Sequence, residues 1–168
     1  MEFFVLPLIA EIGAAFAGFA TLAGIIRHDE LVADAIFSVV LQSLIAVFFA
    51  LAAILFVGSG GSSSESLRAI AMGLLLASVL AVAREIQVYL ATWRQMKEEE
   101  KEGGFGRALG LAGLVSMLPS PLLAASVAGG IFPARAAFLY ELALLSHLLV
   151  AILLLLYVVW KNFALRPD

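Results

Sequence analysis

The sequence predicts an all-α protein that is embedded in a membrane. The chain has 168 residues, of which 63% are hydrophobic and only 14% are charged, and its mean hydropathy is +1.07. A soluble domain carries roughly half apolar and a quarter charged residues, so this composition excludes an ordinary water-soluble globule. The apolar residues gather in stretches that are close to or longer than the roughly 20 residues that cross a bilayer as a helix. We therefore predict an integral membrane protein built as a bundle of five transmembrane helices.

The connections between these stretches are too short to hold a second domain. The longest has about 14 residues, which leaves no room for a soluble active site or a nucleic-acid-binding domain. The chain has no cysteine, which excludes disulfides and thiolate metal sites, and it has no nucleophile, metal or phosphate-binding motif. We therefore expect neither an enzyme nor a cofactor, and the expected ligands are lipid and a cation. The predicted spans of this single domain cover about residues 3–26, 35–57, 67–93, 108–132 and 134–160.

The first stretch carries a glutamate among two rows of small residues. Small side chains let helix backbones approach closely in lipid, where apolar helices gain nothing from each other's hydrophobicity. Glu11 shares a face with Ala14 and Gly18, so it can line a narrow pore or meet its copy on a neighbouring subunit. The alternative is a protonated carboxyl that is hydrogen bonded to Gln42, Ser43 or a backbone carbonyl. The predicted packing residues of this stretch are Ala10, Gly13, Ala14, Ala17, Gly18 and Thr21.

The order of residues in this stretch resembles the pore helix of Orai-type calcium channels. An acid lies near the outer end, small and bulky apolar residues follow, and Arg27 lies at the inner end. The likeness covers this one helix. It implies that Glu11 selects cations in an oligomeric pore, because rings of acidic side chains select cations in channels.

The second and third stretches carry polar residues toward their inner ends. An ionisable side chain at the centre of a membrane helix costs about 2.5 to 3.5 kcal/mol, so each one is a candidate for function. Gln42 lies in the second stretch, at a depth that matches Arg84 and Glu85 in the third. Because adjacent helical residues diverge by about 100°, we expect Arg84 and Glu85 to find partners on other helices rather than to pair. Alternatively, Arg84 extends toward the interface.

Two prolines interrupt the fourth stretch. Pro119 and Pro121, on either side of Ser120, cannot donate the helical hydrogen bonds to Val115 and Met117, so the helix must kink or break. We expect one broken span, and the alternative is a re-entrant segment that leaves four true spans. Broken helices near the midplane also form substrate sites in transporters. The predicted packing residues of this stretch are Gly106, Gly110 and Gly113.

The fifth stretch carries two ionisable residues, Glu141 and His147. Counting the helical rise from the outer ends places Glu141 and Glu11 at one depth, about 10 Å inside, and His147 near the midplane. Glu141 and His147 face different directions, so no direct relay between them is expected. A histidine here is more often a hydrogen-bonded core residue than a proton shuttle. The candidate ion-pathway residues are Glu11, Glu141, His147, Gln42, Arg84 and Glu85.

The basic residues predict the orientation of the chain. Lys and Arg concentrate near the cytoplasmic ends of membrane spans. Seven of the ten fall on the side of the first and third connections and the C-terminal tail, and the other side holds only Arg68 and Arg135. This distribution places the N-terminus outside and the C-terminus in the cytoplasm. Tyr157 and Trp160 then lie at the cytoplasmic interface, where aromatic residues are enriched.

Together these observations predict an ion channel or another ion-translocating protein of the bacterial inner membrane. We expect a homo-oligomer in which Glu11 selects the cation. The alternative is a non-catalytic accessory subunit of a larger membrane complex, whose small-residue faces meet partner proteins and whose acids hold helices together. Neither function involves nucleic acid.

Overall fold

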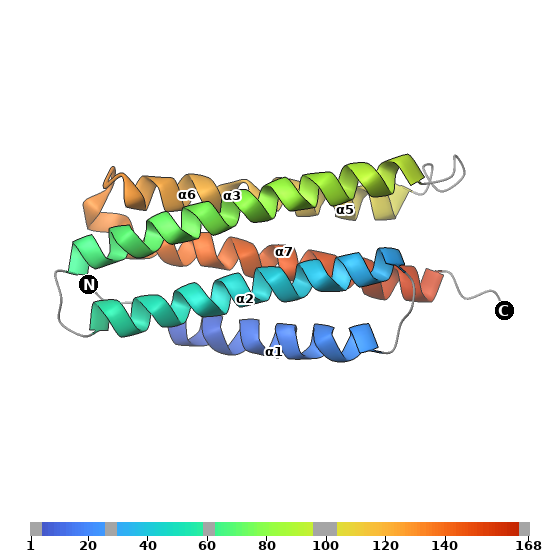
Figure 1. The fold of residues 1–168 in the computed structure, drawn as a ribbon, viewed down its shortest axis with the longest axis horizontal. Coiled ribbons are helices and arrows are strands. Elements are labelled where there is room, and N and C mark those ends of the chain that lie inside the picture. The colour runs from blue at the N-terminus through green and yellow to red at the C-terminus, as the bar shows by residue number, and fades with distance from the viewer. Residues whose placement is uncertain (1–4, 26–29, 59–62, 96–103, 165–168) are drawn as a thin grey trace.

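The computed structural model of the chain is a bundle of helices that run along one axis (Figure 1). It describes residues 5–25, 30–58, 63–95 and 104–164, among which no strand occurs. Successive passes along the bundle alternate in direction, so α1, α3 and α7 run the same way. The helices are α1 (Leu6–Ile25), α2 (Glu30–Gly58), α3 (Ser63–Gln95), α5 (Gly104–Met117), α6 (Pro119–Ala128), the 3-10 helix η1 (Pro133–Arg135) and α7 (Ala136–Ala164).

Within the described residues, four helical stretches are long and apolar enough to cross a membrane. α1 is also apolar, but its apolar part, Leu6–Leu22, is shorter. Phe48, Leu55 and Leu122 are 65%, 66% and 68% exposed on the outside of the bundle, as expected for a surface that faces lipid. The second to fifth predicted stretches are thus confirmed as apolar helices of spanning length. They cover Ala33–Phe56, Ser64–Ala91, Leu111–Ala128 and Pro133–Trp160.

α7 is the central helix of the bundle. It packs against α1, α2, α5 and α6, while α3 packs against α2, α5 and α6. Leu6 of α1, Leu74 of α3 and Leu144 of α7 are fully buried in one shared core. Tyr140 lies in the same core, and its Oη donates to the Phe49 carbonyl of α2 at 2.8 Å. α7 therefore connects α1, α2 and the broken fourth stretch.

The fourth stretch is broken at Leu118, between α5 and α6, as the prolines predict. Leu118 keeps helical dihedral angles, φ −61° and ψ −36°, and its N–H donates to the Val115 carbonyl at 3.3 Å. α5 and α6 follow one another along the bundle (Figure 1), so the stretch does not return to the end where it starts. Both halves also pack against α7, so the path of this stretch runs along the bundle and does not turn back.

A tight turn connects α6 to η1 and α7. The Gly130 N–H donates to the Val127 carbonyl at 3.0 Å, and the Ile131 N–H donates to the Ser126 carbonyl at 3.1 Å. These two hydrogen bonds form a Schellman motif, which requires a left-handed residue after the helix. Gly130 meets that requirement with φ +66°, a conformation that glycine adopts without strain.

Candidate functional site

Polar side chains from four helices meet inside the bundle. They are Gln42 of α2, Ser78 of α3, Ser120 of α6 and His147 of α7. His147 Nε2 lies 2.9 Å from Ser78 Oγ and 2.8 Å from Ser120 Oγ, and the two hydroxyl oxygens are 3.0 Å apart. On the other side of the ring, His147 Nδ1 lies 2.5 Å from Gln42 Oε1. All four side chains are buried, so this central cluster holds α2, α3, α6 and α7 together.

The hydrogen bonds of the central cluster determine which ring nitrogen carries hydrogen. Gln42 Oε1 can only accept, so in the neutral ring His147 Nδ1 donates and Nε2 accepts from a serine hydroxyl, while Gln42 Nε2 is buried without a hydrogen-bond partner among the described residues. Ser78 Oγ also lies 2.7 Å from the Leu74 carbonyl, to which it can donate, and this leaves Ser120 as the donor to Nε2. The amide of Gln42 does not take up and release protons, so proton transfer through His147 would stop at Gln42. These hydrogen bonds fit a histidine that holds helices together in the core rather than one that carries protons.

A second polar cluster surrounds Arg84, further along α3. Arg84 Nη1 donates to Ser38 Oγ at 2.7 Å and to Glu85 Oε1 at 2.9 Å, and Nη2 lies 3.9 Å from Asp34 Oδ1. Its guanidinium carbon lies 4.5 Å from the centre of the Phe37 ring. The predicted partner on another helix is confirmed for Arg84, on α2. The expectation that Arg84 and Glu85 do not pair is wrong, because their long side chains converge beside Ser38 in the space between α2 and α3.

Glu141 binds the beginning of α1. Its Oε1 accepts a hydrogen bond from the Val5 N–H at 3.1 Å, and the residue is only 7% exposed. The first N–H groups of a helix have no helical acceptor, so this carboxyl stabilises the end of α1. The predicted common depth of Glu11 and Glu141 is therefore wrong. α1 and α7 run in parallel and α1 starts beside Glu141, so Glu11 lies about 9 Å deeper at 1.5 Å per residue (Figure 1).

Glu11 belongs to neither cluster. It is exposed on α1, as are Ala14 and Gly18 on the same face, and a Cβ built on Gly18 meets nothing within 4 Å. Gln42 binds the central histidine, and Ser43 Oγ is buried with no hydrogen-bond partner among the described residues. The expected alternative, in which Glu11 bonds to either of these side chains, is therefore not what the structure has.

The small residues of α1 divide between two faces. A Cβ on Gly13 would lie 2.7 Å from Val47 Cγ2 and 3.1 Å from the Ser43 carbonyl oxygen, so Gly13 permits the close packing of α1 on α2. The opposite face remains open. Of the other predicted packing residues, Ala10 and Ala17 are half-buried, Ala14, Gly18 and Thr21 are exposed, Gly113 is buried in α5, and the surroundings of Gly106 and Gly110 lie outside the described residues.

Three polar residues of these clusters, Asp34, Ser38 and Ser78, were not predicted from the sequence. A serine in an apolar helix commonly bonds to a carbonyl of its own helix, as Ser78 does with Leu74, so a lone serine carries little information. The spacing of polar residues along α2 could have identified two of the three residues. Asp34, Ser38 and Gln42 follow one another at intervals of four and thus form one polar stripe along α2.

Comparison with known proteins finds no match to this chain, neither to a family model, nor to a curated protein, nor to a solved structure. Its own residues therefore provide the functional argument. The described residues present two kinds of ionisable group inside the apolar helices. Arg84, Glu85, Glu141 and His147 are bonded within the chain, whereas Glu11 is exposed and has no polar partner in the part that the structure describes.

Proposed function

We propose that the chain is a multi-pass membrane protein that assembles with copies of itself and translocates a cation along a path lined by Glu11. In this proposal α1 is a fifth membrane-crossing helix, the N-terminus lies outside, and the C-terminus lies in the cytoplasm of a bacterium. The observation that carries the proposal is the position of Glu11, which is exposed on an apolar helix beside Ala14 and Gly18.

The first support is energetic. A carboxyl in contact with hydrocarbon costs about 2.5 to 3.5 kcal/mol near the centre of a membrane helix. Glu85 and Glu141 avoid this cost through hydrogen bonds inside the chain. Glu11 has no such partner among the described residues, so a second copy of the chain, or a water-filled path between copies, is the simplest way to remove its contact with lipid.

The second support is steric. Ala14 and Gly18 follow Glu11 at helical spacing, and the space around Gly18 is open. Membrane helices associate where small residues allow their backbones to approach. Another small residue of this helix, Gly13, already contacts α2 within the chain. The Glu11 face is thus the part of α1 that is free to meet a neighbouring copy.

The selected ion follows from the charge of this face. Carboxylates that are repeated around a symmetry axis attract cations and replace part of their hydration shell, as acidic rings do in cation channels. In this arrangement the central cluster at His147 and the cluster at Arg84 hold α2, α3 and α7 in position behind α1. The only ligands that the proposal requires are the cation and lipid.

The experiment is a flux measurement on the purified protein in liposomes. We expect wild-type protein to conduct monovalent or divalent cations, and Glu11→Gln to reduce the flux about tenfold or more because the attracting charge is lost. Glu65→Gln is the matched control, since it removes the same charge from the exposed start of α3, and its flux should equal that of the wild type. Because Glu11 has no polar partner in the part of the chain that the structure describes, Glu11→Gln should keep the wild-type melting temperature. Absence of flux, or equal flux from wild type and Glu11→Gln, would overturn the proposal.

A second candidate function is that of an accessory subunit in a larger membrane complex. It is favoured by the bonds of Arg84 and Glu141, which hold helices together and leave no free chemistry at those positions. Purification from native membranes in mild detergent separates the two candidates. A stoichiometric second polypeptide supports the accessory subunit, whereas a homo-oligomer without other chains supports the ion-translocating protein.

A further inference from the structure

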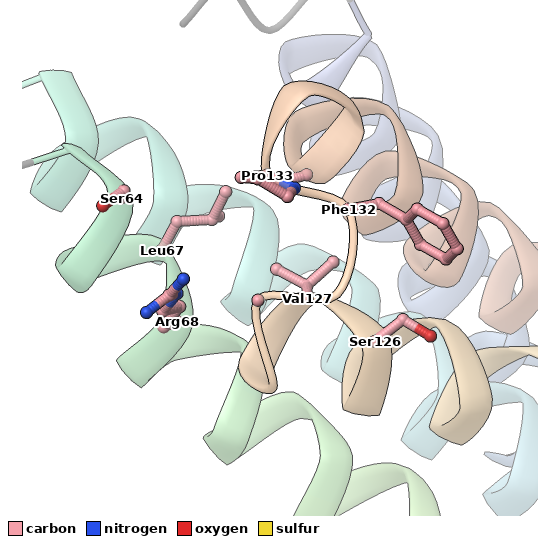
Figure 2. A pocket seen from close by; sticks show the side chains of 9 residues that line it. Ser64, Leu67, Arg68, Ser126, Val127, Phe132 and Pro133 are labelled. Carbon is pink, nitrogen blue, oxygen red and sulfur yellow. The ribbon is translucent and has the colours of Figure 1, made fainter.

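A small cavity lies at the end of the bundle where α3 begins and α6 leads into α7 (Figure 2). We propose that this cavity binds the phosphate group of an anionic phospholipid. Its volume is about 60 Å³, well above the roughly 10 to 15 Å³ that one water molecule requires. Its walls include Ser64, Leu67 and Arg68 of α3, Val127 of α6, and Phe132 and Pro133 of the connection.

Arg68 gives the cavity its charge. Ser64 lies one turn before Arg68 on α3, so a hydroxyl and a guanidinium line the same wall. In the part of the chain that the structure describes, Arg68 forms no ion pair, in contrast to Arg84 with its two carboxylate neighbours. A guanidinium presents several N–H donors in a plane and binds phosphate oxygens in pairs. An exposed arginine beside a hydroxyl therefore suits a phosphate group.

Gly130 makes room for this guanidinium. A Cβ at this position would overlap Arg68 Nη2, so the arginine lies against the turn only because residue 130 has no side chain. The turn itself does not need the arginine. The carbonyls of Ser126 and Val127 already accept hydrogen bonds from backbone N–H groups of the turn. The charge of Arg68 is thus available for a ligand rather than used to close α6.

The other walls of the cavity are apolar and continue onto the outside of the bundle. Leu67 and Val127 are buried between α3 and α6, whereas Phe132 is 55% and Ile131 is 64% exposed. The cavity also lies where three helical stretches of spanning length begin or end, which is where lipid headgroups meet a membrane protein. The phosphate of a phospholipid can bind Arg68 while its acyl chains contact the exposed apolar side chains. A free phosphate ion would make only the first of these contacts.

This inference rests on the membrane location in the proposed function, but not on ion transport. The test is a titration of the purified full chain in detergent with phosphatidylglycerol, phosphatidylcholine or inorganic phosphate, followed by native mass spectrometry. Wild-type protein should bind phosphatidylglycerol at about tenfold lower concentration than phosphatidylcholine, because both lipids carry the phosphate but the choline ammonium cancels its charge and repels Arg68, the charged residue that lines the cavity. Arg68→Gln should remove this preference. Arg135→Gln is the matched control, because Arg135 is exposed at the same end but does not line the cavity, and it should change binding less than about twofold.

Three results would overturn the inference. The first is equal binding of the two lipids, and the second is an equal loss of phosphatidylglycerol binding in both arginine variants. The third is displacement of phosphatidylglycerol by millimolar inorganic phosphate, which would indicate a site for the free ion. Because both arginines are exposed, both variants should keep the wild-type melting temperature. Protein that inserts into membranes and conducts no ions, but binds phosphatidylglycerol through Arg68, would contradict the proposed function and leave this inference intact.

Discussion

His147 uses both of its ring nitrogens to connect helices. Nδ1 binds Gln42, and Nε2 is within hydrogen-bond distance of Ser78 and Ser120. Hydrogen bonds between membrane helices contribute about 0.6 kcal/mol on average and up to about 1.7 kcal/mol. Ser120 is the most informative member, because it follows Pro119 at the start of α6 and thus ties the helix break to α7.

We predict that Ser120→Ala destabilises the protein by about 1 kcal/mol, because His147 Nε2 loses a donor while it stays buried. The control is Ser116→Ala. The Ser116 hydroxyl donates to the Gly113 carbonyl within its own helix, so its loss should cost less than about 0.5 kcal/mol. The measurement is the free energy of unfolding in mixed detergent micelles. An equal effect of the two changes would contradict the role of the central cluster.

The sequence identified Gln42 and the ionisable residues inside the predicted spans, but it did not identify the serines that bind them or which helix each partner is on. Gln42 matched Arg84 in depth, yet it binds His147. A sequence gives the depth and the face of a residue on its own helix, whereas its partner depends on how helices rotate and slide against each other. Close contacts such as that of Gly13 with Val47 set this arrangement, and no pattern in a single sequence reports them.

At the scale of elements, α1 differs most from the other helices. It begins beside Glu141, five residues inside α7, so its first N–H groups lie below the end of the bundle. Unpaired N–H groups are costly where no water reaches them. The Glu141 carboxyl supplies the acceptor for Val5. Nothing in the sequence indicated this offset, because the predicted apolar stretch that contains α1, about residues 3–26, is long enough to cross a membrane like the others.

We predict that Glu141→Leu loosens the beginning of α1, because the Val5 N–H loses the acceptor that the Glu141 carboxyl provides. Glu141→Gln should preserve the contact, since a glutamine oxygen also accepts a hydrogen bond. Hydrogen exchange at Val5 should accelerate about tenfold or more in the leucine variant and stay near wild type in the glutamine variant. Equal exchange in the leucine variant and the wild type would show that the contact does not protect α1.

The break of the fourth stretch was predictable from the positions of its prolines, but the path of the chain after the break was not. Pro119 and Pro121 remove helical donors whatever the path of the chain. The path depends on packing, and both α5 and α6 pack along α7. Leu118 consequently keeps helical dihedral angles, and the stretch continues along the bundle.

At the scale of the whole molecule, α1 lies at the edge of the bundle and has one packed face and one open face (Figure 1). Gly13 lies on the packed face and Gly18 on the open face. Two changes of equal size at these positions therefore have different consequences. One affects the fold of the single chain, and the other affects its assembly.

We predict that Gly13→Leu lowers the melting temperature, because a larger side chain meets Val47 and overpacking costs about 1 to 3 kcal/mol. Gly18→Leu should leave the melting temperature of the single chain unchanged, because open space surrounds Gly18. It should instead reduce the oligomer fraction in size-exclusion chromatography with light scattering. A Gly18→Leu protein that assembles like the wild type would contradict the assembly face.

The most direct test of the central claim is disulfide cross-linking of α1 in native membranes. The chain has no cysteine, so a single Gly18→Cys substitution reports only contacts between copies. We predict covalent dimers from Gly18→Cys under mild oxidation, and none from Val79→Cys, which is exposed on α3. Equal cross-linking at both positions, or none at residue 18, would contradict the proposal that the Glu11 face of α1 meets another copy of the chain.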